Sequence, residues 1–99
     1  MSGVKKDEGK APIIEGCVWV FPRALTEVAL LSLKALQKYP SYDNWHQVEN
    51  GFARYTNALG RHVVLEKIEG VDPEDGVDHA VKVAWNALAR LELKLRGQG

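Results

Sequence analysis

Residues 69–79 bring acids, glycines, a proline and a histidine together in one short stretch, E-G-V-D-P-E-D-G-V-D-H. Glu69 follows Glu66 by three residues, so on a helix both carboxylates project from one face. Asp72 comes within one turn of them. Clustered carboxylates suit Mg²⁺, which keeps several waters and uses one or two protein carboxylates together with substrate phosphates. The spacing therefore indicates a magnesium site at this turn.

The same stretch also has an ordinary structural explanation. Acids before a helix satisfy its free N–H groups and its positive end. Asp75 or Asp78 could be the cap, and D-P-E-D-G is a typical turn sequence. The sequence leaves the metal site and the capped turn open.

Two arginines are candidates for binding phosphate. Arg54 and Arg61 are seven residues apart and share one face of a helix, and His62 follows Arg61 directly. The arginine guanidinium matches the geometry of phosphate oxygens. The alternative is that both arginines pair with acids on the surface.

A polar strip is predicted on the last helix. His79, Lys82 and Asn86 follow one another at i, i+3 and i+7, and could contact phosphate, sugar and base. Alternatively, Lys82 pairs with Asp78 four residues earlier. Asn86 in mid-helix competes with the backbone unless its side chain has a partner.

Two pairs of residues flank the first long loop, Lys38-Tyr39 and Asn44-Trp45. Aromatic side chains beside amides can stack on a nucleobase, or they can simply close the end of a helical bundle. No glycine-rich phosphate loop, C-x-x-C, H-E-x-x-H or serine–histidine elbow is present, so the sequence gives no support for a nucleophilic enzyme.

Bulk composition limits the other classes of function. The chain has 99 residues, which fits one domain, with thirteen basic and thirteen acidic residues. This balance argues against bulk nucleic-acid binding. A single cysteine rules out an internal disulfide and favours a cytoplasmic protein. There is no membrane-spanning run and no apolar leader.

Three helices are expected from the hydrophobic pattern. They cover about residues 22–39, 52–68 and 77–96, and the β-branched and aromatic residues 18–21 predict an extended arm before them. We therefore predict an all-α fold: a flexible tail over residues 1–12 and a single helical domain over residues 13–96. The apolar stripes exceed what three helices can bury, which favours a homo-oligomer with a shared helical bundle.

The order of these elements resembles a known family. The chain carries G-K-A-P at 9–12, A-L-T-E-V-A at 24–29, K-Y, N-W, R-Y-T-N-A-L-G-R-H at 54–62, E-x-x-D-P-E-D-G at 69–76, H-x-x-K at 79–82 and Asn86. This resembles the small all-α dATP/dGTP diphosphohydrolase N-terminal domain family of bacteriophages. That family is similar in character to MazG-like nucleotide pyrophosphohydrolases.

The resemblance implies an activity and a set of site residues. The activity is Mg²⁺-dependent hydrolysis of a deoxynucleoside triphosphate to monophosphate and pyrophosphate. The implied catalytic residues are Glu69, Asp72 and His79, and Glu74 joins Glu66, Glu69 and Asp72 as a metal ligand. The resemblance adds Lys38, Tyr39, Asn44, Trp45, Arg61, His62 and Asn86 as nucleotide-binding residues, and the spacing along the helices adds Arg54 and Lys82.

The chain departs from the family pattern at three places. Lys82 replaces the second histidine of H-x-x-H, Asp75 replaces a serine, and the glycine that usually precedes the acid follows Glu69. A lysine adds fixed positive charge, which favours holding a phosphate over hydrolysing it. A second hypothesis is therefore a non-catalytic phage protein that sequesters a nucleotide or a cyclic nucleotide immune signal. A third hypothesis is a purely structural helical adaptor.

Overall fold

The computed structural model describes residues 8–99, so residues 1–7 of the predicted tail lie outside the described residues. Three α-helices dominate this part of the chain: α1 (Pro22–Ala35), α2 (Gly51–Glu69) and α3 (His79–Leu95). Two short helical turns, η1 (Ile14–Val18) and η2 (Asn44–Gln47), precede α1 and α2. Residues 8–99 contain no β-strand, apart from an isolated bridge between Val71 and Asp78. The all-α prediction is confirmed.

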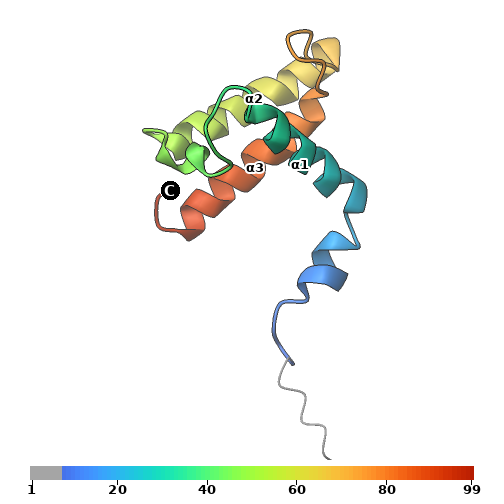
Figure 1. Cartoon of the computed structure of the whole chain (residues 1–99), viewed down its shortest axis with the longest axis vertical. Helices are drawn as coiled ribbons and strands as arrows, with labels where there is room; N and C mark the ends of the chain where they lie inside the picture. Colours follow the sequence, from blue (N-terminus) through green and yellow to red (C-terminus); the bar gives the residue numbers. More distant parts are fainter. Residues whose placement is uncertain (1–7) are drawn as a thin grey trace, which may run out of the picture.

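The long helices α2 and α3 form an antiparallel pair joined by the acidic turn (Figure 1). Helix α1 crosses this pair and packs against α3, and η2 packs against both α2 and α3. Gly51 allows a close approach at the start of α2, since a Cβ there would lie 3.1 Å from Leu93 Cδ1. The pair α2–α3 therefore forms the frame, and α1 with η2 covers one side of it.

Local sequence signals set the helix ends. Pro22 occupies the first turn of α1, where its missing N–H costs nothing. Helix α3 begins at His79 because Asp78 caps it, with Asp78 Oδ1 accepting a hydrogen bond from the Ala80 N–H at 2.8 Å. The third helix therefore begins two residues later than predicted, and α1 ends at Ala35 rather than near residue 39.

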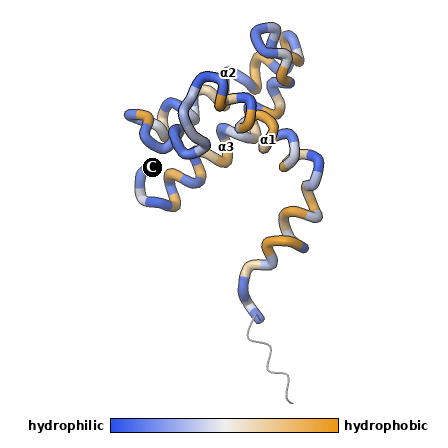
Figure 2. The backbone as a smooth tube through the Cα atoms, viewed as in Figure 1, coloured by the Kyte–Doolittle hydropathy of each residue, from blue (hydrophilic) through white to orange (hydrophobic). Residues whose placement is uncertain are grey.

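The predicted extended arm is wrong. Residues 14–18 form a π-helical turn, with the Trp19 N–H donating to the Ile14 carbonyl at 2.8 Å and the Phe21 N–H to the Cys17 carbonyl at 3.0 Å. The physical reason is that no strand in the described chain is available as a partner, so the backbone satisfies its own hydrogen bonds. The segment projects away from the helices (Figure 1) and carries apolar residues (Figure 2).

Little of this chain is fully buried. Within residues 8–99, the buried positions are Gly51, His79, Asn86, Ala89 and Leu93, four of them on α3. The radius of gyration is 16.5 Å, against about 13 Å for a compact chain of 100 residues. Large apolar residues stay exposed, including Trp19 at 69% and Phe21 at 56%.

Across residues 8–99, none of the helices combines the length and the apolar character that a membrane crossing requires.

Candidate functional site

The acidic turn between α2 and α3 is closed by its own backbone. Gly70 ends α2 with a φ of 70°, and Gly76 turns the chain back with a φ of 75°, a region that favours glycine. The Asp72 N–H donates to the Val77 carbonyl at 2.8 Å, and the His79 N–H donates to the Gly70 carbonyl at 2.9 Å. These bonds hold the carboxylates of the turn beside the first turn of α3.

Lys82 is the partner of two of these carboxylates. Its Nζ lies 2.8 Å from Asp72 Oδ2 and 2.6 Å from Asp75 Oδ2, and its side chain is only 13% exposed. The other oxygens are also engaged: Asp72 Oδ1 accepts from the Glu74 N–H, and Asp75 Oδ1 accepts from the Val77 N–H. Lys82 therefore does not form the alternative pair with Asp78, which caps α3 instead.

These contacts shift three pKa values. The hydrogen bond from Lys82, then that from the Glu74 N–H, lowers the pKa of Asp72. Burial acts to raise the pKa of Asp75 and to lower that of Lys82, but their mutual hydrogen bond and the other partners outweigh it. The net result is a lowered pKa for Asp75 and a raised pKa for Lys82. All three groups are therefore charged at neutral pH.

Helix α1 also reaches the turn. Lys34 Nζ donates to the backbone carbonyl of Asp75 at 2.6 Å. Lys38 lies 3.9 Å from Glu74, and both side chains are largely exposed, so this second contact contributes little.

A chain of hydrogen bonds links Glu69, His79 and His62. Glu69 Oε1 lies 2.7 Å from His79 Nε2, and His79 Nδ1 lies 2.8 Å from His62 Nδ1. His79 is fully buried between them. Because the two Nδ1 atoms face each other, one must donate and the other accept.

Which atom donates in each of these hydrogen bonds determines which ring nitrogen of His62 keeps a free lone pair. When His79 Nε2 donates to the Glu69 carboxylate and His79 Nδ1 accepts, His62 donates from Nδ1. The Nε2 of His62 then carries a lone pair. Burial, then the charge of Lys82, lowers the pKa of His62 below its ordinary value of 6.5, so the ring is neutral at pH 7.

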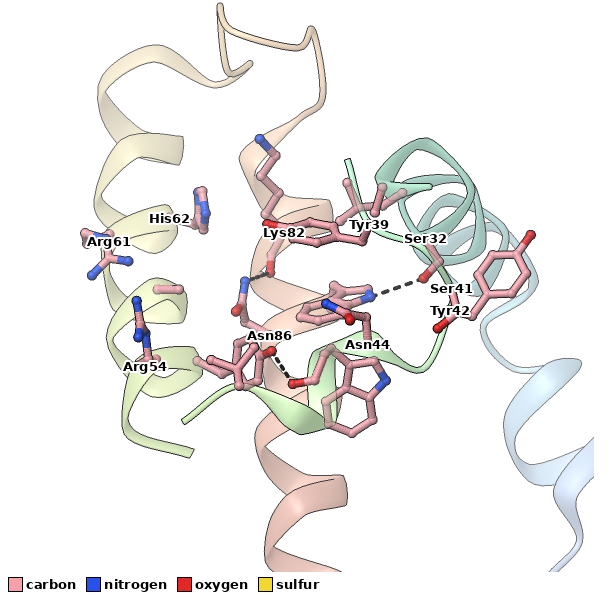
Figure 3. Close-up of a pocket in the computed structure, with 17 residues that line it drawn as sticks. Ser32, Tyr39, Ser41, Tyr42, Asn44, Arg54, Arg61, His62, Lys82 and Asn86 are labelled. Carbon is pink, nitrogen blue, oxygen red and sulfur yellow. Dashed lines mark hydrogen bonds between the residues drawn. The ribbon is translucent and has the colours of Figure 1, made fainter. Parts of the chain in front are cut away.

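A pocket of about 510 Å³ opens beside these groups, between α1, the loop around η2, and the α2–α3 pair (Figure 3). Its polar lining includes Ser32, Tyr39, Ser41, Tyr42, Asn44, Arg54, Arg61, His62, Lys82 and Asn86. Trp45, Tyr55 and Trp85 supply aromatic surface, with ring centroids 5.5 to 6.2 Å apart. A pocket of this size with aromatic walls and a few polar groups is typical of a small-molecule site.

The pocket and the acidic turn meet at two residues. Glu69 and Asp72 are not among the residues that line the pocket. Lys82 lines it and bonds directly to Asp72, whereas His62 lines it and is linked to Glu69 through His79. The described structure therefore presents a basic and aromatic face to the pocket, with the acids behind it.

Eight of the nine predicted nucleotide-binding residues line this pocket, and Lys38 lies instead at the acidic turn. Tyr39, Asn44 and Trp45 come from the loop, Arg54, Arg61 and His62 from α2, and Lys82 and Asn86 from α3. The predicted polar strip is also more enclosed than expected. Asn86 is buried, and its side chain donates to the Lys82 carbonyl at 2.7 Å.

Only part of the predicted metal set comes together. Glu69, Asp72 and His79 each offer one ligand atom within 4.8 Å of the others. Glu66 and Glu74 do not belong to this cluster. The donor set suits one divalent cation, and because Lys82 and His79 already engage Asp72 and Glu69, a cation must share or displace these partners.

Sequence reasoning missed Tyr55 and Trp85 as site residues because both fall on apolar stripes. The hydroxyl of Tyr55 and the indole N–H of Trp85 could have indicated these positions, since a buried Tyr hydroxyl or Trp N–H normally needs a hydrogen-bond partner. Tyr55 O–H donates to the Trp45 carbonyl at 2.6 Å, and Trp85 Nε1 donates to Ser32 Oγ at 3.2 Å. Burial raises the pKa of Tyr55, so its hydroxyl remains a donor.

Comparison with known proteins agrees with the resemblance noted in the sequence. A family model described as dATP/dGTP diphosphohydrolase, N-terminal, matches residues 2–99. A protein of Salmonella phage PMBT28 named dATP/dGTP diphosphohydrolase is 38% identical over 85 residues, which cover 85% of this chain. The chain spans about a quarter of that relative, 27% of its length. No solved structure matches. The chain belongs to the dATP/dGTP diphosphohydrolase N-terminal family.

Proposed function

We propose that the chain binds a deoxynucleoside triphosphate in the pocket and hydrolyses it to the monophosphate and pyrophosphate with Mg²⁺. The observation that carries this proposal is the continuity of the pocket with the acidic turn, through Lys82 and His62. Family membership and the name of the phage relative support the same substrate class.

The pocket offers separate groups for base and phosphate. Trp45, Tyr55 and Trp85 provide apolar surface on which a base can stack, and Asn44 and Asn86 provide amides for its edge. Arg54 and Arg61 line the pocket from α2, where their guanidinium groups suit phosphate oxygens.

The divalent cation would be held by the carboxylates of Glu69 and Asp72, and His79 would position Glu69 through their 2.7 Å hydrogen bond. A bound Mg²⁺ would supply charge that offsets the phosphate oxygens and the leaving pyrophosphate. Arg54, Arg61 and Lys82 would add fixed positive charge on the same side.

His62 is the best placed proton acceptor for the attacking water. It lines the pocket, it is neutral at pH 7, and its Nδ1 is held by His79. His79, predicted as catalytic, is fully buried behind His62. Its role in this proposal is to position His62 and Glu69 rather than to touch the nucleotide.

We also propose that the protein works as a homo-oligomer with sites near the subunit contacts. The described chain leaves large apolar residues exposed between η1 and α1, such as Trp19 and Phe21, and on α1, such as Leu33. Exposed apolar residues that gather into one patch are typical of interaction sites.

A second candidate function is sequestration without hydrolysis. The ion pairs of Lys82 favour it, because Lys82 already binds Asp72, one of the two carboxylates of the proposed cation site. The ligand would then be a nucleotide or a cyclic nucleotide that keeps its phosphate bonds.

One experiment distinguishes the two functions. The protein is incubated with dATP or dGTP and Mg²⁺, pyrophosphate is followed, and any nucleotide retained after heat denaturation is identified. Pyrophosphate release supports the hydrolase, whereas intact nucleotide without turnover supports sequestration. The absence of both results would refute nucleotide binding in the pocket.

The phosphate contacts are tested by variants in the same assay. Arg54→Ala and Arg61→Ala should each weaken nucleotide binding by between about tenfold and 100-fold, because each removes a charge-assisted hydrogen bond worth about 1.5–3 kcal/mol. Arg23→Ala is the matched control, since Arg23 is an exposed arginine on α1 outside the pocket lining. An equal loss in all three variants would contradict a specific role for the α2 arginines.

A further inference from the structure

Lys82 lies between the carboxylates of the acidic turn and the pocket. Its ammonium cannot bond fully both to these acids and to the phosphate of a ligand in the pocket. Its side chain lines the pocket, but its ammonium lies on the acidic turn, 2.8 Å from Asp72 and 2.6 Å from Asp75. Figure 3 shows the side chain extending along α3 past the other polar residues of the pocket. An ammonium has three N–H donors, and two of them are used on these carboxylates.

The position of the ammonium conflicts with a divalent cation. A Mg²⁺ ion binds carboxylate oxygens at about 2.1 Å, and the Asp72 oxygen that faces Lys82 is already bonded to it. The second Asp72 oxygen accepts the Glu74 N–H. A cation on Asp72 would therefore lie within a few ångströms of the Lys82 ammonium and would repel it.

The pocket gives the displaced ammonium a destination. Lys82 is anchored on α3 at the pocket wall, and the same wall holds Asn86 one turn further on. Arg54 and Arg61 line the same pocket, where the proposed function places the phosphates of the nucleotide. An ammonium that leaves the acids remains beside the ligand.

We propose that Lys82 competes with a divalent cation for Asp72 and thereby couples cation binding to nucleotide binding. The cation displaces the ammonium from the acids, and the displaced ammonium binds a nucleotide phosphate. The reverse also holds, because coupling between two ligands is reciprocal: a phosphate that attracts Lys82 frees Asp72 for the cation. This inference rests on the proposed nucleotide function and assigns Lys82 a role in the order of binding.

The test is Mn²⁺ binding, measured by electron paramagnetic resonance without nucleotide. Lys82→Met removes the ammonium and keeps an apolar side chain of similar length. Removing a cation a few ångströms from the binding site should tighten Mn²⁺ binding about tenfold. Lys82→Arg keeps the charge and should bind Mn²⁺ as the unmodified chain does. Mn²⁺ binding to Lys82→Met that is equal or weaker would overturn the proposal.

Lys34→Met is the matched control. Lys34 also donates to the acidic turn, but to the backbone carbonyl of Asp75 rather than to a carboxylate. Its loss should change Mn²⁺ affinity less than about threefold, because the group is exposed and screened. A gain equal to that of Lys82→Met would mean that only the net charge of the turn matters, and would overturn direct competition.

A measurement on the unmodified chain keeps the test valid if Lys82→Met does not fold. With ¹⁵N-labelled lysine, the ammonium of an ion-paired Lys82 should give its own resonance, assigned by its absence in Lys82→Arg. Saturating Mg²⁺ with a non-hydrolysable dATP analogue should shift this resonance, and an unchanged signal would refute displacement.

The two proposals fail in different ways. A protein that shows the Mn²⁺ competition but releases no pyrophosphate keeps the coupling role of Lys82 and loses hydrolysis. A protein that releases pyrophosphate while Lys82→Met leaves Mn²⁺ affinity unchanged keeps hydrolysis and loses the coupling.

Discussion

His62 and His79 share one hydrogen bond but have different surroundings. His79 is fully buried and its two ring nitrogens are bonded to Glu69 and His62, so the ring is fixed in orientation. His62 is partly exposed and lines the pocket. A fixed buried ring behind a partly exposed one is a way to hold the second ring in one tautomer.

This arrangement predicts separate effects on binding and turnover. His62→Ala should lower the rate of pyrophosphate release about 10²-fold, the usual contribution of a positioned acid–base group. Nucleotide affinity should change less than about threefold, because Arg54 and Arg61 remain. Steady-state pyrophosphate release and tryptophan fluorescence, reported by Trp45 and Trp85 in the pocket, measure the two quantities.

Val63→Ala serves as the control, because Val63 is the next residue on α2 and is exposed. A loss that appears only in affinity, with unchanged turnover, would show that His62 binds the nucleotide and does not accept a proton.

Residue-level prediction from the sequence succeeded where a helix alone sets the geometry. Arg54 and Arg61 share a helical face and both line the pocket, as spacing predicted. The partner of Lys82 could not be predicted in this way. Its choice of Asp72 and Asp75 over Asp78 depends on how the turn folds back and on Asp78 capping α3, which are tertiary features.

At the scale of elements, the acidic turn is a charged junction that depends on pH. The pKa values of Asp72 and Asp75 are lowered from an ordinary value of 3.8, so the unfolded chain takes up protons first as the pH falls. Their contribution to stability is complete above about pH 4 and is lost as the pH falls through the folded-state pKa values. The pKa of Lys82 is raised from 10.5, so its contribution is complete below that pH and is lost as the pH rises further.

Asp75→Asn tests this junction. The variant keeps a side-chain oxygen for the Val77 N–H but loses the charge that faces Lys82. The free energy of unfolding should fall by about 0.5–1 kcal/mol at neutral pH, as expected for a partly exposed ion pair. The decline of stability below about pH 4 should become shallower. Urea denaturation at several pH values measures both effects.

Glu74→Gln is the comparison for Asp75→Asn, because Glu74 is 78% exposed and its contact with Lys38 is 3.9 Å long. It should leave stability nearly unchanged. A pH dependence in Asp75→Asn as steep as that of the unmodified chain would contradict the assignment.

The presence of the three α-helices could be predicted from the periodic spacing of apolar residues and from Pro22. The helical turn at residues 14–18 could not. Val18, Trp19 and Val20 have strand propensity, but a strand also needs a partner, and propensity does not supply one. The backbone bonds of η1 run within the segment itself. The local signal was therefore overruled by the requirement that backbone groups be paired.

At the scale of the whole molecule, the exposed apolar segment predicts self-association. Trp19→Ser combined with Phe21→Ser should shift the protein toward a monomer in light scattering after size exclusion, because both side chains are more than half exposed and removing them lowers the apolar area available for contact. The control is Tyr42→Ser, an exposed aromatic residue in the loop before η2. A monomeric unmodified chain, or an unchanged assembly in the double variant, would refute the proposed interface.

The way the pocket is built has a consequence for folding. One wall comes from α1 and the loop around η2, and the opposite wall comes from the antiparallel pair. A molecule seated between them touches both parts at once, so its binding free energy also fastens the first helix to the remainder of the chain. For so small a protein, the bound molecule would contribute packing contacts that otherwise only a larger hydrophobic core would supply.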